Sequence, residues 1–189
     1  MSDKDSLRAS VRAARSAMPA EERETARQAI RRAVLRQCRE LPLPAGSRIA
    51  AYEPLRTEPG SVELLRDLRA AGYQVIVPRT LPDRDLDWLP WTEPAATPAQ
   101  SLGRDAIGTA ALVLVPAFAV DLAGRRLGRG GGSYDRALAR VPAGTVTAAL
   151  IFAGELVERV PTAAWDQPVT AVVNPTGWLD LTRTGRRNT

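Results

Sequence analysis

The sequence predicts an α/β fold in a single domain, with a mostly parallel sheet flanked by helices and preceded by an N-terminal helical hairpin. From residue 48 onward, short apolar runs alternate with helical patterns, the order typical of parallel strands joined by crossover helices. The run at 111–115 is apolar at every position, as expected for a strand covered on both faces. The first 40 residues show helical periodicity alone.

Two helices are expected at the N-terminus, over residues 3–18 and 21–39. Their expected inward-facing residues are Leu7, Val11, Ala14 and Met18 in the first helix, and Ile30, Val34 and Cys38 in the second. Because few residues separate the two helices, we expect them to form an antiparallel hairpin over residues 1–40.

The remaining elements alternate between strand and helix. Strands are expected at 48–52, 74–78, 86–89, 111–115, 147–152 and 169–173, and helices at 62–71 and 134–140. Residues 82–103 are rich in proline, threonine and alanine and should be largely loop, and the polar end, residues 182–189, should be a flexible tail. A length of 189 residues suits one domain, residues 1–189, with a sizeable core.

Composition restricts the possible chemistry. The chain has no histidine, which excludes Ser-His-Asp and Cys-His catalysis and most zinc sites. Its 26 basic residues include one lysine, Lys4, and the net charge of +5 favours anionic partners such as nucleotides, polyglutamates or nucleic acid. We expect no membrane partner, because no apolar stretch approaches the length of a span. A single cysteine and the lack of a secretory signal pattern predict a cytoplasmic protein.

The most informative segment is 112–135, LVLVPAFAVDLAGRRLGRGGGSYD. A strand-like run is followed by arginines, by four glycines and then by the start of a helical pattern. Glycines let the backbone approach a ligand closely, and a following helix start directs N–H groups toward it. Arginines add a permanent positive charge. Together these features predict an anion site, best suited to phosphate. The spacing matches neither a Rossmann loop, nor a Walker A loop, nor a nucleophile elbow.

At RLGRGGGSYD the chain resembles the 5-formyltetrahydrofolate cyclo-ligase (methenyltetrahydrofolate synthetase) family. Further resemblance lies, in the same order as in the family, in the K-x-x-L-R motif from Lys4 to Arg8, the turn from Tyr52 to Glu58, the strand end Val77-Pro78-Arg79, and Val160-Pro161 followed by Asp166. The resemblance covers most of the chain, and its central block is the most specific part.

The resemblance implies an enzyme that uses ATP and Mg²⁺. In this family ATP phosphorylates the formyl oxygen of 5-formyltetrahydrofolate, N10 attacks the activated carbon, and phosphate leaves as 5,10-methenyltetrahydrofolate forms. The substrate is a reduced folate, which can carry a polyglutamate tail. Such chemistry depends on positioning and charge stabilisation more than on a protein base, so the missing histidine is no obstacle.

The same resemblance implies roles for particular residues. ATP would be bound by Lys4, Arg8, Arg126, Leu127, Gly128, Arg129, Gly130, Gly131, Gly132, Ser133 and Tyr134. The folate would contact Glu53, Glu58 and the loop residues Arg129, Gly130, Gly131, Gly132 and Ser133. Arg129, Gly131 and Tyr134 would lie at the reacting groups, and Asp135 and Asp166 would hold Mg²⁺ as oxygen ligands.

Several positions depart from the family pattern. Ser133 stands where the family usually has a tyrosine, Trp165 where it has a histidine, and Thr170 where it has an aspartate. Glu155 replaces a usual glutamine, and the stretch 88–94 is short. These departures concern mainly the folate side of the site, so an ATP-dependent relative with a changed acceptor remains an alternative.

A third alternative belongs to another class, a basic nucleic-acid-binding module. The high positive charge and the arginine-rich helices favour it. Arginine and glutamate alternate along the second helix, however, and no pattern of interleaved aromatic and basic residues is present. Nucleic acid is therefore not the expected partner.

Overall fold

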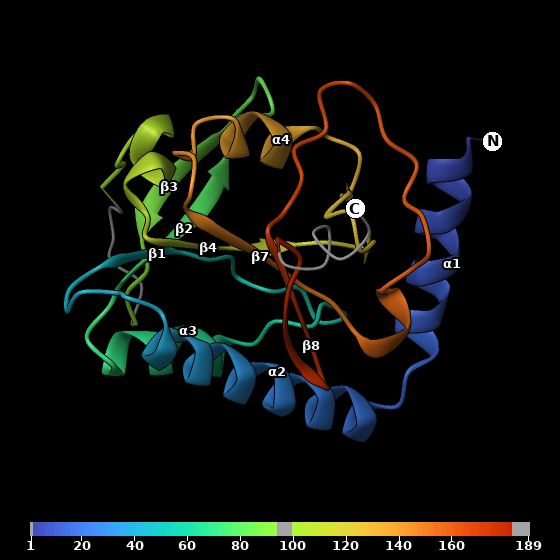
Figure 1. Cartoon of the computed structure of the whole chain (residues 1–189), viewed down its shortest axis with the longest axis horizontal. Coiled ribbons are helices and arrows are strands. Elements are labelled where there is room, and N and C mark those ends of the chain that lie inside the picture. Colours follow the sequence, from blue (N-terminus) through green and yellow to red (C-terminus); the bar gives the residue numbers. More distant parts are fainter. Residues whose placement is uncertain (1, 94–99, 183–189) are drawn as a thin grey trace.

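The computed structural model describes residues 2–93 and 100–182. Its largest sheet has seven strands in the order β3-β2-β1-β4-β7-β8-β9, and a separate pair is formed by β5 and β6 (Figure 1). The elements in chain order are α1 (Asp3–Ala17), α2 (Ala20–Glu40), β1 (Arg48–Ala50), α3 (Val62–Ala70), β2 (Gln74–Thr80), β3 (Leu86–Pro90), the 3₁₀ helix η1 (Arg104–Thr109), β4 (Leu112–Pro116), β5 (Ala119–Val120), β6 (Arg126–Leu127), α4 (Ser133–Leu138), β7 (Val146–Leu150), η2 (Ala153–Glu155), β8 (Ala171–Asn174) and β9 (Gly177–Asp180).

The five central strands run parallel, and each outermost strand is antiparallel to its neighbour. Ile49 of β1 lies opposite Val75 of β2 on one side and Leu112 of β4 on the other. The single, mostly parallel sheet flanked by helices is therefore confirmed. All six predicted strands are present, and β9, β5 and β6 were not predicted.

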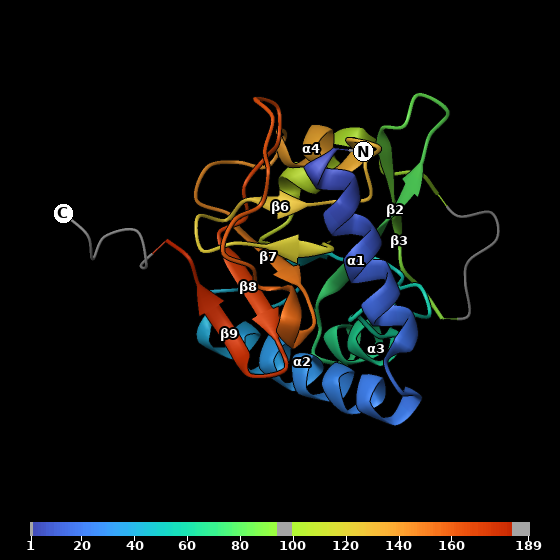
Figure 2. The same cartoon turned by 90° about the vertical axis from the view of Figure 1, so that its right-hand side faces the viewer.

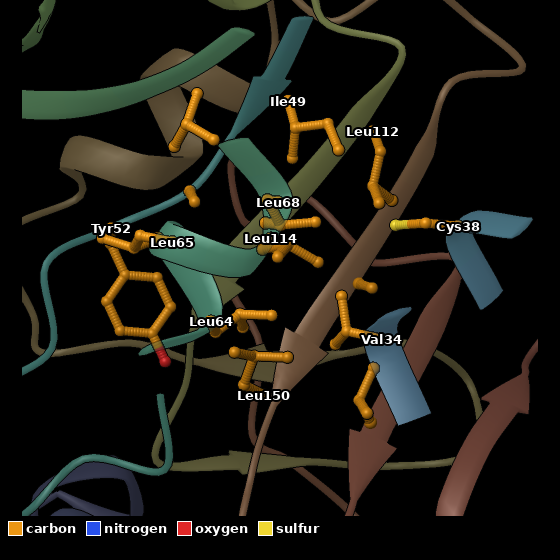
Figure 3. Packing of buried hydrophobic residues seen from close by; sticks show 14 of the residues in the cluster. Val34, Cys38, Ile49, Tyr52, Leu64, Leu65, Leu68, Leu112, Leu114 and Leu150 are labelled. Carbon is orange, nitrogen blue, oxygen red and sulfur yellow. The ribbon is translucent and has the colours of Figure 1, made fainter. Parts of the chain in front are cut away.

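Two apolar clusters cover the two faces of the sheet. On one face, side chains of α2 and α3 pack against Ile49, Leu112, Leu114 and Leu150 (Figure 3). The predicted inward residues Ile30, Val34 and Cys38 of α2 are all buried there, and burial raises the pKa of the Cys38 thiol to about 11. On the other face, α4 and η1 cover the sheet around Trp88 and Val113. The sheet core is therefore apolar on both sides, as its continuous hydrophobic strands require.

The expected antiparallel hairpin of α1 and α2 is wrong. Both helices form, but they point in different directions and do not lie side by side (Figures 1 and 2). Helix α2 packs on the sheet, whereas α1 belongs to a small third cluster with Phe118, Leu127 and Val160. Each helix buries its apolar face against another part of the chain and not against the neighbouring helix. These separate contacts set the angle between α1 and α2.

Local signals explain where the helices begin. The Ser2 hydroxyl accepts a hydrogen bond from the Asp5 amide at 3.3 Å, and the Ser61 hydroxyl does the same for Leu64 at 3.2 Å. Such N-caps satisfy amides that have no partner within the helix. Helix α4 begins differently, after Gly132, whose φ of +66° is a left-handed conformation that favours glycine.

The chain reverses its direction of winding between β1 and β4. The crossover through α3 leads from β1 outward to β2, whereas the crossover through α4 leads from β4 outward to β7 on the other side. Ligands of doubly wound sheets bind outside the carboxyl ends of the strands at such a reversal. The site is therefore expected beyond Ala50 and Pro116.

Part of the predicted 82–103 loop, residues 94–99, and most of the predicted tail, residues 183–189, lie outside the described residues. Among the described helices, none is long and apolar enough to span a membrane.

Candidate functional site

A cavity of about 990 Å³ opens at the carboxyl ends of β1 and β4. Its walls come from the N-terminal part of α1, the turn after β1, the glycine-rich segment before α4, and the 161–170 segment before β8. Every residue predicted for the site lines it: Lys4, Arg8, Glu53, Glu58, Arg126, Leu127, Gly128, Arg129, Gly130, Gly131, Gly132, Ser133, Tyr134, Asp135 and Asp166. The structure therefore brings together residues up to 162 positions apart in the sequence.

The glycine segment adopts conformations that few other residues could take. Gly130 has a φ of +102° and Gly132 a φ of +66°. A Cβ atom at Gly128 would lie 2.7 Å from Nη1 of Arg126, inside any normal contact. The segment is thus shaped to pass close to the arginines and to the cavity, which fits a loop that wraps an anion.

Two arginines from different helices hold the carbonyls of this loop. Arg8 Nε of α1 donates to the Gly128 oxygen at 2.9 Å. Arg136 Nη2 of α4 donates to the Gly131 oxygen at 3.2 Å and to the Arg84 oxygen at 2.7 Å. The two guanidinium groups donate to the carbonyls of Gly128 and Gly131, so the loop is held near both of its ends.

The side chain of Arg126 is almost fully buried, in contrast to the more exposed Arg8. Its Nη2 donates to Asp135 Oδ1 at 2.8 Å, and its guanidinium lies over the ring of Tyr134, 5.9 Å from the centroid. Burial raises the pKa of the Tyr134 hydroxyl far above its usual value, so this side chain stays neutral. A buried arginine paired with one carboxylate and exposed to a cavity remains a strong partner for a second anion.

Lys4 and Asp166 form a second ion pair in the cavity lining, close to Asp135, because the Gln167 amide donates to Asp135 Oδ1. Lys4 Nζ donates to Asp166 Oδ2 at 2.6 Å, and the Ala163 amide donates to the same oxygen at 2.8 Å. Burial acts to raise the pKa of Asp166, but the hydrogen bonds and the charge of Lys4 outweigh it and lower the pKa below the usual value. The Asp166 carboxylate is therefore ionised at neutral pH.

The wall formed by the turn after β1 is acidic and partly apolar. Glu58 is buried and accepts from the Leu55 amide at 2.9 Å, with Arg129 Nε 4.0 Å from its other oxygen. Glu53 Oε1 accepts from Trp91 Nε1 at 3.1 Å. This wall offers the two carboxylates, with Arg129 beside Glu58, so it is more acidic than the part of the cavity lined by Lys4, Arg8 and Arg126.

A buried ion pair that the sequence did not reveal contributes Arg15 to the cavity lining. Arg15 of α1 donates from Nε and Nη2 to the two Glu155 oxygens at 2.6 and 2.7 Å, and from Nη2 to the Ala117 carbonyl at 2.6 Å. Its guanidinium also lies over Phe118 and Phe152. One feature of the sequence could have revealed Arg15: Lys4, Arg8 and Arg15 lie on the same face of the helix as the buried Val11.

The positions that depart from the family pattern are distributed unevenly. Ser133 and Trp165 line the cavity, and Trp165 is largely exposed at its rim. Thr170 does not line the cavity, because its hydroxyl accepts from the Thr147 amide at 2.9 Å and donates to the Thr147 carbonyl, joining β7 to the start of β8. Glu155 does not line the cavity, and its carboxylate accepts the hydrogen bonds of Arg15.

Asp135 and Asp166 could supply two of the oxygen ligands of a magnesium ion, and the other ligands would have to come from substrate or water. The hydrogen bonds of each carboxylate converge on one oxygen, Oδ1 of Asp135 and Oδ2 of Asp166. Within the described residues, no group of three or more acidic, cysteine or histidine side chains could hold a metal. Mg²⁺ commonly binds through one or two carboxylates together with substrate phosphates and water, so the two aspartates suffice beside a triphosphate.

Comparison with known proteins agrees with this geometry. A family model described as the 5-formyltetrahydrofolate cyclo-ligase family matches residues 1–175. The chain belongs to the 5-formyltetrahydrofolate cyclo-ligase family. A relative of that name from Mycolicibacterium smegmatis is 37% identical over 145 residues, covering 69% of this chain and 75% of the relative.

Two solved structures share the cyclo-ligase fold. The 5,10-methenyltetrahydrofolate synthetase of Mycoplasma pneumoniae is 21% identical, with a TM-score of 0.76 over 92% of this chain and 99% of its own. The 5,10-methenyltetrahydrofolate synthetase of Aquifex aeolicus is 25% identical, with a TM-score of 0.71 over 94% of this chain and 92% of its own. The fold of this protein is that of these synthetases.

Proposed function

We propose that this protein converts 5-formyltetrahydrofolate and ATP to 5,10-methenyltetrahydrofolate, ADP and phosphate. One observation carries the proposal: the separate motifs of the cyclo-ligase family converge on one cavity at the reversal point of the sheet. Membership of the family and the relative from M. smegmatis support the same activity.

The cation-rich wall suits the nucleotide. Lys4 and Arg8 of α1 line the cavity together with Arg126, Arg129 and the glycine loop, which Arg8 contacts at the Gly128 carbonyl. A polyphosphate bound there would meet fixed positive charges and the amides at the start of α4. In our proposal these groups hold ATP with its γ-phosphate toward Arg129 and Gly131.

The acidic wall suits the reduced folate. In our proposal Glu53 and Glu58 accept hydrogen bonds from ring N–H groups, and the formyl group lies near the glycine loop. Both glutamates and this loop line the same cavity, which supports the arrangement. The formyl oxygen would take the γ-phosphoryl group, N10 would attack the activated carbon, and the oxygen would leave with the phosphate. The protein orients both substrates and excludes water, while Arg129 and Tyr134 face the reacting groups.

Magnesium is part of the proposal. Asp135 and Asp166 would hold the ion beside the phosphates, where it neutralises charge that develops on the triphosphate. A cytoplasmic location is proposed as well, and cell fractionation tests it.

A turnover assay tests the proposed activity. Purified protein with MgATP and 5-formyltetrahydrofolate should yield the methenyl product, detected by its absorbance, with one ADP released per product. ATP hydrolysis that does not depend on the folate and forms no folate product would contradict the proposal.

Thermal shift separates this activity from the two alternatives. MgATP with 5-formyltetrahydrofolate should stabilise the protein more than MgATP alone if the folate is the acceptor. Stabilisation by MgATP that the folate does not increase would favour a relative with a changed acceptor, and stabilisation by an oligonucleotide alone would favour a nucleic-acid-binding module.

A further inference from the structure

Trp165 is the most exposed large hydrophobic side chain in the part of the chain that the structure describes, at 70% of its full accessibility. Burying an indole contributes substantially to stability, so a tryptophan left in solvent is more informative than an exposed leucine. Trp165 also lines the cavity, whereas Leu122, another exposed apolar side chain, does not. The indole face is thus available at the rim of a ligand site.

The turn that presents Trp165 is fixed on both sides. Asp166 on the C-terminal side is held by Lys4 and by the Ala163 amide, and its own amide donates to the Ala163 carbonyl at 3.1 Å. The next amide, Gln167 N, donates to Asp135 Oδ1 at 3.3 Å. The turn is therefore attached to the two aspartates and, through them, to Lys4 and Arg126.

The turn that carries Trp165 and the turn that carries Glu53 and Glu58 lie at different ends of the cavity, so they would contact different parts of the bound substrates. Glu53 and Glu58 follow β1, toward the β2–β3 side of the sheet, whereas the turn precedes β8, on the opposite side. Figure 2 shows the 161–170 segment and the β2–β3 hairpin on opposite sides of α4. ATP bound with its γ-phosphate toward the folate has its base at the end remote from the folate. In that orientation the base end would lie on the Trp165 side of the cavity.

We propose that the indole of Trp165 stacks on the adenine ring of ATP and so makes the site prefer a nucleoside triphosphate over bare polyphosphate. The inference rests on the proposed function for the identity of the nucleotide. Stacking needs a flat aromatic face and no hydrogen-bond partner, and an exposed indole supplies that face. The phosphates bind through cations that Trp165 does not touch, so the two contributions can be measured separately.

The test is calorimetric titration of MgATP and of magnesium tripolyphosphate into the wild type, Trp165→Ala, Trp165→Phe and Leu122→Ala. We expect Trp165→Ala to weaken ATP binding about tenfold or more, the scale of one base–aromatic stack. Trp165→Phe should retain most of the affinity, and tripolyphosphate should bind equally to all four proteins. Leu122→Ala is the matched control for removing an exposed apolar side chain, and it should bind ATP like the wild type.

Three results would overturn the inference. ATP could bind Trp165→Ala as well as the wild type, ATP and tripolyphosphate could weaken together, or the KM for 5-formyltetrahydrofolate could rise while ATP binding stays unchanged. The third result would place the indole against the folate. A wild type that binds MgATP but forms no methenyl product would refute the proposed activity while leaving the adenine contact standing, so the two failures are distinguishable.

Discussion

Two ion pairs attach α1 to distant parts of the chain, and they differ in what surrounds them. Near its C-terminal end, Arg15 and Glu155 are buried, with side-chain exposures of 4% and 8%, and two hydrogen bonds join them. Near its N-terminal end, Lys4 and Asp166 are exposed by 24% and 13%, face the cavity, and are joined by one hydrogen bond. Two of the cations on α1 therefore lie in different environments, one buried and one open to the cavity.

The difference indicates that the Arg15–Glu155 pair anchors α1, whereas the Lys4–Asp166 pair can take part in ligand binding. Arg15 is already occupied, because it donates to both Glu155 oxygens and to the Ala117 carbonyl and lies over Phe118 and Phe152, and Glu155 does not line the cavity. The Lys4 pair is open on the cavity side, where a phosphate or a metal ion can share the charge of either partner. The anchor at Arg15 fixes the helix, and the fixed helix holds Lys4 and Arg8 in the wall of the site.

The largest expected effect is on stability, from Arg15→Ala. It leaves the Glu155 carboxylate buried without its partner, so the free energy of unfolding should fall by about 3–5 kcal/mol. Urea unfolding measures this fall. Arg12→Ala is the control, because Arg12 is an exposed arginine on the same helix, and its effect should stay below about 1 kcal/mol. Equal unfolding midpoints for Arg15→Ala and the wild type would show that the buried pair does not anchor α1.

The next effect is on turnover, from Asp135→Asn. The amide keeps the shape of the side chain but loses its charge, so turnover should fall about 100-fold, equivalent to about 2.7 kcal/mol, and more Mg²⁺ should be needed for half-maximal rate. Steady-state rates across a magnesium titration measure both quantities. Asp105→Asn, at a highly exposed aspartate outside the cavity, should leave both unchanged. An unaltered magnesium dependence in Asp135→Asn would remove this residue from the metal site.

The third effect is on ATP affinity, from Lys4→Ala. If Lys4 binds phosphate, the affinity should fall by about 1.5–3 kcal/mol, the scale of a charge-assisted hydrogen bond. Lys4→Arg should recover only part of the loss, because a planar guanidinium does not occupy the place of a compact ammonium. Calorimetry measures the affinity, and thermal melting should show little change. Equal ATP affinity in all three proteins would mean that α1 does not reach the nucleotide.

The smallest effect concerns acid stability at the Lys4–Asp166 pair. A carboxylate with a lowered pKa in the folded state contributes stability above the pKa of the unfolded chain and loses it as the pH falls through the folded-state value. The wild type should therefore lose more stability than Asp166→Asn as the pH falls from about 5 to about 3. The difference should stay below about 1 kcal/mol, because the pair is partly open to solvent. Urea unfolding at both pH values measures it, and parallel curves for the two proteins would contradict the ion pair.

The sequence predicted the features that are encoded locally. The apolar run at 111–115 became β4, and the glycines before Tyr134 became the loop with left-handed residues, because each depends on neighbouring residues alone. The angle between α1 and α2 could not be predicted in this way. It is set by Phe118 and Val160 for α1 and by the sheet for α2, which are contacts across most of the chain.

The candidate site shows the same limit. The motifs identified its lining residues but not Arg15, because periodicity analysis counts an arginine as a surface residue and so favoured Ala14 for the inward face. In the structure Ala14 is exposed and Arg15 is buried. The partner that makes this burial possible, Glu155, lies 140 residues away, and no local pattern connects the two.

The arginines that hold the Gly128 and Gly131 carbonyls have a further consequence for the energetics of binding. A glycine-rich segment loses more conformational entropy on ordering than any other sequence, and a free loop would lose it when the ligand binds. Here Arg8 and Arg136 already restrict the loop, so that entropy is lost on folding. The interaction energy of the triphosphate is then available as affinity, which is the advantage of a preorganised site.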